Sequence, residues 1–414
     1  MCGRHPRRRR DGRLQRPGSG GPVVITVIGF DGSPLPARAR AALDAADLVA
    51  GTARILDELD LAPTAVRHEL VRLDDLFAAI SGHDRVCVLA SGDPGFFGIV
   101  RTMRETGLDV EVVPAVSSVA AAFAAIGLAW DDAMVVSAHG RDLRPVVNAC
   151  RAFPKVAVLT GPHAGARELG AELPDRTFVV AQRLGHADQK VEILSSHAAA
   201  HAEFADPYVL LCLDESRLAS ERGWLAGFQG VPGAWALPEA EFAHRDSMIT
   251  KSEVRALALA RLGPRPGRLV WDIGAGSGSV GIECARFGAA VVAVERDAES
   301  ADRIRTNAAA LSVTVEVVAA DALDALDRLP CPDSVFVGGG GAEVIAACAE
   351  TPATTVVVAL AAIERVPDAI SLLTKAGRAV DGVLLQSSRL SALPGDTHRF
   401  AAANPVFLLW GERP

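Results

Sequence analysis

Glycines alternate with other small residues in one short segment, Asp272–Ser279, which reads D-I-G-A-G-S-G-S. An apolar stretch ends within its first residues, and a helical pattern follows it. Glycine lets the backbone approach a ligand closely, and the first turn of a helix offers unpaired N–H groups. This strand–turn–helix pattern predicts that main-chain atoms hold a nucleotide-like ligand. The residues expected to contact it are Gly274, Ala275, Gly276, Ser277 and Gly278.

Two carboxylates follow the turn at the spacing that such a ligand needs. Glu295 ends the next apolar run, about twenty residues on, where a carboxylate can accept hydrogen bonds from both ribose hydroxyls. Asp321, with Ala322 beside it, follows the third run and is expected to hold the adenine amino group. A dinucleotide fingerprint G-x-G-x-x-G would require glycine at position 279, where this chain has Ser279. The pattern D-x-G-x-G-x-G is instead typical of methyltransferases that use S-adenosylmethionine (SAM).

Methyl transfer from SAM requires few reactive side chains from the protein. The sulfonium already activates the methyl group, so the enzyme mainly holds an acceptor atom in line with it. SAM is therefore the expected co-substrate, and no metal is expected. Enzymes that methylate amino groups of bases carry an N-P-P-Y-like motif after the fourth strand, where this chain has Val337–Gly340. The similar Asn404–Phe407 lies before the last strand and is interpreted as a turn, so amino groups of nucleic acid are disfavoured acceptors.

Short apolar runs alternate with helical stretches on either side of the glycine turn. Such alternation indicates α/β folding with mostly parallel sheets. Seven strands are expected in the C-terminal half: Arg268–Ile273, Ala290–Glu295, Thr314–Ala319, Ser334–Val337, Thr355–Ala359, Ala379–Gln386 and Val406–Trp410. Helices are expected over Lys251–Leu262, Gly278–Phe287, Ala298–Ala310, Ala342–Ala349 and Arg365–Ala376. This layout predicts a Rossmann-like, doubly wound sheet.

The N-terminal half contains a second α/β series. Its expected strands are Val23–Ile28, Val86–Ala90, Val110–Val113, Ala133–Ser137, Val156–Leu159, Thr177–Val180 and Tyr208–Leu213. Asp214–Arg245 breaks the rhythm with glycines and prolines and is interpreted as a linker. We therefore expect a basic, disordered tail over residues 1–21, an α/β domain over 22–213, a linker over 214–245 and a methyltransferase domain over 246–414.

Three loops of the N-terminal half follow strand ends, where open α/β sheets bind ligands. The first follows the opening strand and contains Gly29. The second is Ser91–Gly95, S-G-D-P-G, and the third is Pro114–Ser118, P-A-V-S-S. The candidate ligand-binding residues in the last two loops are Gly92, Asp93, Pro94, Ser117 and Ser118.

The pairing of these loops resembles the tetrapyrrole methylase family, whose members methylate corrin precursors and uroporphyrinogen with SAM. The likeness extends through Ser137–Arg141 and Gln182–Gly185 and covers about Val23 to Leu213. The C-terminal half resembles the partner methyltransferase, including its lead-in Arg245–Arg255. This order of two domains is similar to the decarboxylating precorrin-6B (precorrin-6Y) methyltransferases of cobalamin synthesis.

The resemblance implies a two-lobed N-terminal domain and a division of labour. The family methylates ring carbons 5 and 15 of precorrin-6B and removes carbon dioxide from the acetate at carbon 12, which gives precorrin-8. The first domain would serve carbon 5, and the second would serve carbon 15 and the decarboxylation. The family's usual opening, I-G-x-G-x-D-G, is longer than Ile28–Gly32 of this chain. The first loop is therefore expected to differ in geometry, and a non-catalytic first domain is the alternative.

A substrate rich in carboxylates needs cations around it, because Arg pairs with carboxylates through two parallel hydrogen bonds. The cationic candidates are Arg141, Arg183, Lys251 and Arg389. His139 is a candidate proton carrier, and a purely structural histidine is the alternative. The residues expected to act on the acceptor are Thr250, Lys251, His139 and Arg141.

Composition limits the other classes of function. The net charge of −8 argues against broad nucleic-acid binding. The uncharged span Val112–Trp130 is interrupted by Pro114 and Gly127, so it predicts a buried turn and helix and no membrane anchor. Seven dispersed cysteines fit buried, reduced thiols in a cytoplasmic protein.

Two further alternatives and the assembly state stay open at this stage. The family resemblance suggests a homo-oligomer. An RNA or protein methyltransferase with an N-terminal recruiting module would bind RNA in a salt-sensitive way. A nucleotide-binding oxidoreductase would bind NADH and not SAM.

Overall fold

The computed structural model describes residues 23–205, 207–218, 226–227, 232–245 and 249–413. The expected basic tail and Asp246, the expected first residue of the second domain, lie outside the described residues. Contacts divide the chain into two compact units. One holds the residues up to Ala129 together with Val180–Glu192 and Ala205–Val209; the other holds Trp130–Val179, Ile193–Phe204 and Leu210–Pro414.

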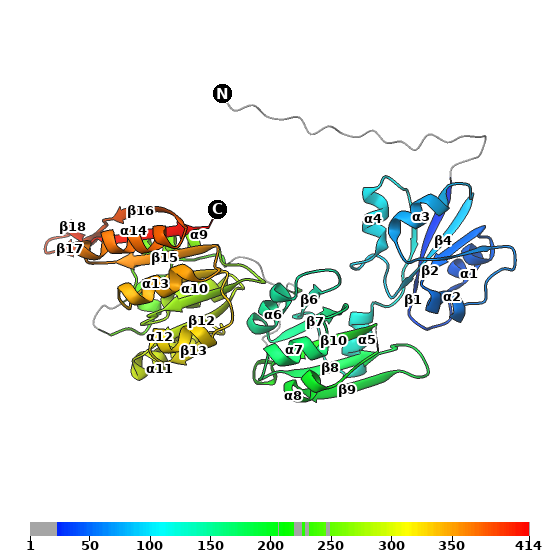
Figure 1. The fold of residues 1–414 in the computed structure, drawn as a ribbon, viewed down its shortest axis with the longest axis horizontal. Helices are drawn as coiled ribbons and strands as arrows, with labels where there is room; N and C mark the ends of the chain where they lie inside the picture. The colour runs from blue at the N-terminus through cyan, green and yellow to red at the C-terminus, as the bar shows by residue number, and fades with distance from the viewer. Residues whose placement is uncertain (1–22, 206, 219–225, 228–231, 246–248, 414) are drawn as a thin grey trace, which may run out of the picture. The chain divides into compact units, whose positions relative to one another are not determined.

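The first sheet is five-stranded, with strand order β3-β2-β4-β1-β5 and parallel pairing (Figure 1). Its strands are β1 (Val24–Phe30), β2 (Leu48–Gly51), β3 (Val66–Glu69), β4 (Arg85–Ser91) and β5 (Glu111–Val113). Its helices are α1 (Ala37–Asp44), α2 (Ala53–Glu58), α3 (Leu73–Ile80), α4 (Ile99–Glu105) and α5 (Ser118–Ala125). Strand β1 is buried on both faces, because Ile28 and Phe30 pack with α1 and α2 while Ile25 and Val27 pack with α3 and α4. Burial on both faces explains its continuous apolar sequence.

The second sheet has the order β6-β7-β10-β8-β9. Its strands are β6 (Met134–Ser137), β7 (Lys155–Leu159), β8 (Thr177–Gln182), β9 (Lys190–Ser195) and β10 (Tyr208–Leu213). Its helices are α6 (Leu143–Ala152), α7 (Ala166–Glu172) and α8 (Ser196–His201). Two short 3₁₀ turns, η1 (Glu215–Arg217) and η2 (Glu239–Glu241), are the regular elements described in the expected linker.

The C-terminal sheet has seven strands in the order β13-β12-β11-β14-β15-β19-β16. They are β11 (Leu269–Ile273), β12 (Ala290–Glu295), β13 (Glu316–Ala319), β14 (Ser334–Val337), β15 (Thr355–Leu360), β16 (Ala379–Leu385) and β19 (Val406–Glu412). The last strand, β19, runs antiparallel between β15 and β16, and the pairs among β11–β15 are parallel. The strand order reverses beside β11, so the loops after β11 and β14 diverge there and leave room for a ligand.

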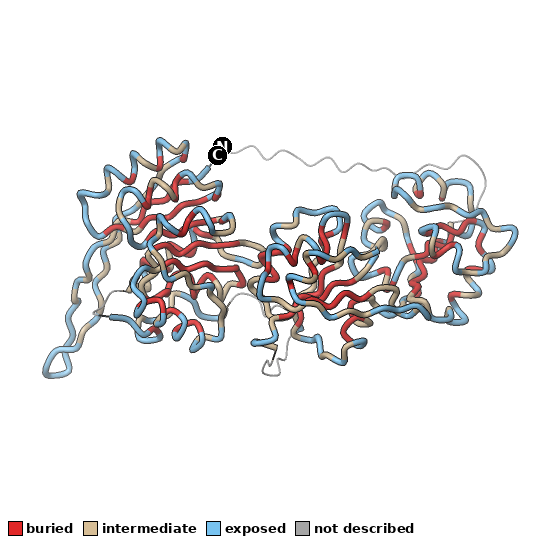
Figure 2. Tube along the Cα trace, turned by 60° about the horizontal axis from the view of Figure 1, so that its bottom comes forward, coloured by how far each residue is buried: buried red, intermediate tan, exposed pale blue. Residues whose placement is uncertain are grey.

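Helices cover both faces of this sheet. They are α9 (Ser252–Leu262), α10 (Ser279–Arg286), α11 (Ala298–Ala310), α12 (Ala322–Ala325), α13 (Ala342–Glu350) and α14 (Val366–Lys375), with 3₁₀ turns η3 (Leu326–Arg328) and η4 (Ile363–Arg365). Leu269 and Trp271 face the core shared with α13 and α14, whereas Val270 faces α9 and α10. Figure 2 shows the buried residues following the strands of each sheet. The α/β fold class and the doubly wound seven-stranded sheet are thus confirmed.

Five strands were not expected from the sequence. Strand β2 is short and reads L-V-A-G, and β3 and β9 lie at sheet edges with polar residues along them. Strands β17 (Ser388–Leu393) and β18 (Thr397–Ala402) form a hairpin of their own, with alternating polar residues. Edge strands and isolated hairpins need no continuous apolar run, so the burial signal is weak in them.

The uncharged span Val112–Trp130 folds as expected, because it contains a turn and then α5, whose Val119, Ala122 and Phe123 are buried. Among the described helices, none has the length and apolar character needed to cross a bilayer. Five of the six described cysteines are buried and Cys331 is exposed.

Candidate functional site

The glycine turn follows β11 and leads into α10. Gly274, Gly276 and Gly278 all have positive φ angles, of 67°, 57° and 73°. A Cβ atom on Gly274 would lie 2.7 Å from Cα of Gly339, and one on Gly278 would lie 2.7 Å from Cγ2 of Ile304. A Cβ on Gly276 would meet no atom within 4 Å. Two glycines are therefore required by close packing behind the turn, and Gly276 faces open space.

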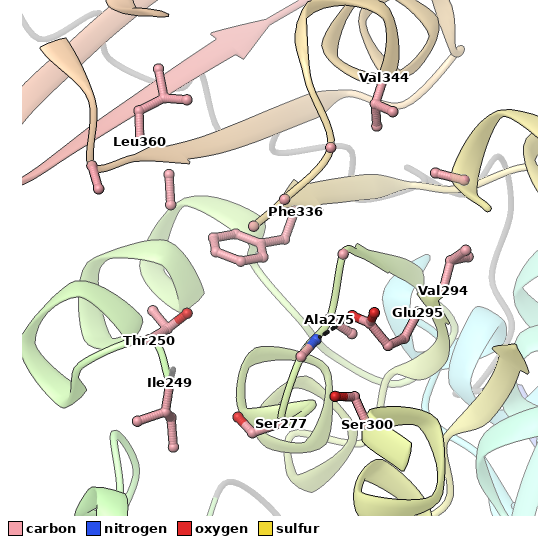
Figure 3. Close-up of a pocket in the computed structure, with 18 of the residues that line it drawn as sticks. Ile249, Thr250, Ala275, Ser277, Val294, Glu295, Ser300, Phe336, Val344 and Leu360 are labelled. Atoms are coloured by element: carbon pink, nitrogen blue, oxygen red, sulfur yellow. Dashed lines mark hydrogen bonds between the residues drawn. The ribbon is translucent and has the colours of Figure 1, made fainter. Parts of the chain in front are cut away.

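That open space is a cavity of about 1190 Å³ at the carboxyl ends of the strands (Figure 3). Nine of the residues predicted from the sequence line it: Thr250, Lys251, Gly274, Ala275, Gly276, Ser277, Glu295, Asp321 and Ala322. Gly278, the tenth prediction for this region, lies behind the turn against Ile304. The structure thus brings together residues from the lead-in to α9, the glycine turn and the ends of two further strands.

Glu295 is held at the cavity by main-chain hydrogen bonds. Its Oε2 accepts from the Gly276 amide at 2.8 Å, the dashed line in Figure 3, and its Oε1 accepts from the Asp297 amide at 3.0 Å. Each carboxylate oxygen has two lone pairs, so acceptor capacity remains on both. Asp321 caps α12, since its Oδ1 accepts from the Leu323 amide at 3.0 Å.

Asp272 lies beneath the turn and is buried, with 1% of its surface exposed. Its Oδ2 accepts from the Gly281 amide at 2.8 Å, and its Oδ1 has no hydrogen-bond partner among the described residues. Burial raises the pKa of Asp272 to about 7, and the nearby Glu295 carboxylate adds to the rise. Buried carboxyl groups favour the neutral form because water no longer solvates the charge.

The segment before α9 is anchored by a buried ion pair. Arg255 Nε lies 2.6 Å from Glu283 Oε1, and both side chains are fully buried. Arg255 also donates to the Thr250 carbonyl oxygen at 2.6 Å and to that of Leu237. Thr250 and Lys251 are therefore positioned at the cavity by a residue one turn further along the chain.

Two of the predicted cations, Arg389 and Arg183, already have carboxylate partners in this structure. Arg389, on β17, pairs with Glu239 at 2.6 Å and with Glu253 at 2.6 Å, so its guanidinium is already neutralised by two carboxylates. Arg183 is likewise paired, with Asp188 at 2.5 Å and with Glu58 at 3.6 Å.

The three N-terminal loops converge at the ends of β1, β4 and β5. A Cβ on Gly29 would lie 2.5 Å from the Gly92 carbonyl oxygen and 2.8 Å from the Ala115 amide nitrogen. One on Gly92 would lie 3.2 Å from the Ser118 amide nitrogen. The predicted residues Gly29, Gly92 and Ser118 are thus neighbours.

Asp31 closes the shortened first loop. Its carboxylate accepts from the Ser33 amide at 3.0 Å and from the Val116 amide at 3.1 Å. Burial by itself would raise the pKa of Asp31, but these main-chain hydrogen bonds outweigh it and lower the pKa. A cavity of about 320 Å³ beside it is lined by Gly29, Asp31, Ser33 and the loop at Pro114. Asp93 and Ser117 bind main-chain amides of their own loops, those of Gly95 and Val119.

Two family models match the chain. A model described as tetrapyrrole (corrin/porphyrin) methylases covers residues 30–199, and one described as a precorrin methyltransferase domain covers residues 240–411. A precorrin-6Y C(5,15)-methyltransferase (decarboxylating) from Sinorhizobium sp. is 39% identical over 62% of this chain and 63% of its own length. The chain thus spans somewhat less than two thirds of that relative. The protein of the same name from Mycobacterium tuberculosis H37Rv is 34% identical over 77% of this chain and 80% of its own length.

The chain belongs to the family of precorrin-6Y C(5,15)-methyltransferases (decarboxylating).

The predicted family and enzyme class are confirmed, since these relatives are named as decarboxylating C-methyltransferases of precorrin. Methyltransferases of this family use SAM. A shorter relative, from Pyrobaculum calidifontis, is named a probable cobalt-precorrin-6B C(15)-methyltransferase (decarboxylating). It is 32% identical over 42% of this chain and 93% of its own length.

Two predicted residues lie apart from the cavities. His139 and Arg141 are exposed in the turn after β6, and neither lines the large cavity or the small one beside Asp31. Among the described residues, no group of three or more His, Cys, Asp or Glu side chains gathers as a metal site would require.

Sequence reasoning missed one wall of the large cavity, the glycine strap Gly338–Gly341 after β14. Gly338 and Gly339 approach the backbone of Gly274, and Arg365 lines the cavities on both sides of the strap. The run of four glycines is visible in the sequence, but there it indicates only that an N-P-P-Y-like motif is absent after the fourth strand.

Proposed function

We propose that the large C-terminal cavity binds SAM and methylates carbon 15 of precorrin-6B, with loss of carbon dioxide from the acetate at carbon 12. The N-terminal domain methylates carbon 5, and the product is precorrin-8. The observation that carries the proposal is the convergence of the glycine turn, Glu295, Asp321, Thr250 and Lys251 on one cavity.

The cavity offers groups for the ribose and the adenine of SAM and open main-chain surface along the glycine turn. The glycine turn offers main-chain surface without a side chain at Gly276, where a Cβ would occupy the ligand's space. Glu295 accepts from the ribose hydroxyls through its free lone pairs, and Asp321, which also lines the cavity, accepts from the adenine amino group. In the N-terminal domain, Gly29, Gly92, Asp93, Pro94, Ser117 and Ser118 hold the second SAM molecule.

The chemistry requires positioning more than proton transfer. An electron-rich ring carbon attacks the methyl group, the sulfur keeps the electrons of the broken bond, and S-adenosylhomocysteine (SAH) leaves. When carbon dioxide leaves, the electrons of the broken carbon–carbon bond pass into the macrocycle. A proton then adds to the carbon that carried the carboxylate. Lys251 faces substrate carboxylates, Thr250 orients the acceptor, and His139 and Arg141 serve the N-terminal reaction. Positioning alone can supply about 7–11 kcal/mol of the barrier reduction.

The short relative supports the division of labour. Its name includes the C(15) methylation and the decarboxylation, yet under half of this chain matches nearly all of it. Both activities therefore fit within one domain-sized part of the chain.

Mass spectrometry of precorrin-6B after incubation with the full chain and SAM tests the proposal. Gain of two methyl groups with loss of carbon dioxide is expected. One methyl group with decarboxylation would restrict catalysis to the C-terminal domain and point to the shortened loop at Asp31. Unchanged precorrin-6B, with SAM bound, would refute the substrate assignment.

We also propose that the enzyme is a cytoplasmic homo-oligomer that binds neither nucleic acid nor membrane. Buried thiols fit a reducing compartment, the acidic net charge argues against nucleic-acid binding, and the homo-oligomer rests on the family resemblance alone. Light scattering of the purified protein tests the assembly state.

A further inference from the structure

One buried amide side chain connects two walls of the large cavity. Asn307, on α11, is 3% exposed. Its Oδ1 accepts from the Ala243 amide at 2.7 Å, and its Nδ2 donates to the carbonyl oxygens of Ala243 and Ser277, both at 2.9 Å. A main-chain donor on one side and two acceptors on the other leave a single orientation of the amide that satisfies all three bonds.

The two segments that Asn307 joins have different places at the cavity. Ser277 belongs to the glycine turn. Ala243 belongs to the segment Ala236–Arg245, whose last residue also lines the cavity. The segment is held at its other end by Glu283, which accepts from the Ala236 and Leu237 amides at 2.6 and 2.9 Å.

Hydrogen bonds from its own amides hold most of the turn, and the Ser277 carbonyl is held differently. Its three positive-φ glycines have wide conformational freedom, and the amides of Gly274, Ala275, Gly276 and Gly278 are bonded within the turn or to β12. The carbonyl of Ser277 is bonded instead to Asn307, which also holds Ala243. A shift of Ala243 therefore reaches the Ser277 carbonyl through the side chain of Asn307.

We propose that Asn307 is a positioning residue that couples docking of the segment Ala236–Arg245 to SAM binding at the glycine turn. The inference rests on the proposed function, since it assumes that SAM binds there. Coupling of this kind is reciprocal: if the docked segment raises SAM affinity, bound SAM must hold the segment in place by the same factor. The linker that follows the first methylase domain is thus part of the second domain's SAM site.

Hydrogen exchange of the full chain, titrated with SAH, tests the coupling. Protection of the peptide over Gly274–Ser279 reports affinity at this site alone, whatever the N-terminal domain binds. Protection of the peptide over Ala236–Phe242 reports whether the segment is docked. It does so independently of Asn307, because the Ala236 and Leu237 amides bond to Glu283. In the wild type, SAH is expected to protect both peptides with the same midpoint.

In Asn307→Ala, the SAH midpoint at the turn is expected to rise about tenfold or more, and SAH no longer protects Ala236–Phe242. Asn307→Asp keeps the acceptor for the Ala243 amide but turns its second carboxylate oxygen toward the carbonyl oxygens of Ala243 and Ser277, so an effect at least as large as that of Asn307→Ala is expected in this second variant. Thr306→Ala is the matched control, because Thr306 is exposed and bonds only to the Asp302 carbonyl oxygen of its own helix.

Weaker SAH binding with undiminished protection of Ala236–Phe242 would overturn the coupling and leave a purely structural role in the turn. An unchanged midpoint in both folded variants would overturn it as well. If wild-type protein shows no protection of the turn by SAH, the proposed function fails first, and the inference fails with it.

Discussion

Arg255 and Glu283 form an ion pair of 2.6 Å in which neither side chain is exposed to solvent. Burial of two charges is costly unless further hydrogen bonds satisfy them. Here they do, because Glu283 accepts from the Ala236 and Leu237 amides and Arg255 donates to the Leu237 and Thr250 carbonyls. The guanidinium also lies 4.9 Å from the Phe242 ring. The pair therefore fastens the end of the linker onto α9 and α10.

Removing one partner of this pair should destabilise the fold strongly. Glu283→Ala leaves a buried guanidinium unpaired and two amides without acceptors, so a loss of about 3–5 kcal/mol in unfolding free energy is expected. Urea denaturation measures it. Arg286→Ala is the control, since Arg286 lies 3.8 Å from Glu283 and is partly exposed, and a loss of about 1 kcal/mol or less is expected there. Equal losses in the two variants would contradict the anchoring role.

Two glycines of the turn should respond differently to alanine. Gly274→Ala places a Cβ 2.7 Å from the Gly339 backbone, so the strap or the turn must move and the unfolding free energy should fall by more than about 2 kcal/mol. Gly276→Ala meets no atom, so only the left-handed strain of about 1 kcal/mol is expected. Its Cβ enters the cavity instead, so SAH binding should weaken with the fold intact. Thermal unfolding with and without SAH separates the two effects.

Asp272 should make stability depend on pH. Folding raises its pKa from an ordinary 3.8 to about 7, so the folded state binds the proton more tightly than the unfolded chain does. The unfolding free energy therefore falls as pH rises from about 4 to about 7 and is level above. Between pH 5 and 7 the fall should be about 2 kcal/mol. Asp272→Asn should lose this dependence, and the exposed Asp302→Asn should keep it. Parallel pH profiles for wild type and Asp272→Asn would refute the assignment.

The parts of the site that lie on buried parallel strands could be predicted from the sequence. Strand β11 is a continuous apolar run because both of its faces are covered, and its end marks the glycine turn. Glu295 could be found by counting to the end of the next run. Glycine at 274 and 278 follows from the left-handed backbone and the close approach of Gly339 and Ile304.

The bonds that place these parts could not be predicted, because they join residues distant in sequence. Asn307 is separated from Ala243 by 64 residues, and in a helix its sequence context resembles that of a solvated polar residue. Arg389 is separated from Glu239 by 150 residues. No spacing rule connects such pairs; their meeting depends on the completed sheet. The positive charge of Arg389 by itself predicts a contact with substrate carboxylates. The fold instead provides two carboxylates of the chain, Glu239 and Glu253, as its partners.

Arg389 should act on stability and not on the acceptor. Its hydrogen bonds lower the pKa of Glu239 to about 2 and also lower the pKa of Glu253. A carboxyl whose pKa falls on folding stabilises the fold above its unfolded pKa, so this contribution is lost as pH falls from about 4.5 toward 2. Arg389→Met should lower the unfolding free energy at pH 7 by only about 1 kcal/mol, because Arg389 and Glu253 are each 40% exposed.

The decisive comparison is with Arg399→Met on β18, because Arg399 is exposed and makes no ion pair among the described residues. Urea denaturation at pH 7 and pH 3 should show Arg389→Met converging with wild type in acid, while Arg399→Met stays parallel to wild type at both values. If Arg389 instead bound substrate carboxylates, its replacement would raise the KM for precorrin-6B and leave the unfolding free energy unchanged. That result would require the hairpin β17–β18 to release Glu239 and Glu253 during catalysis, and the ion pairs described above would then belong to a resting state.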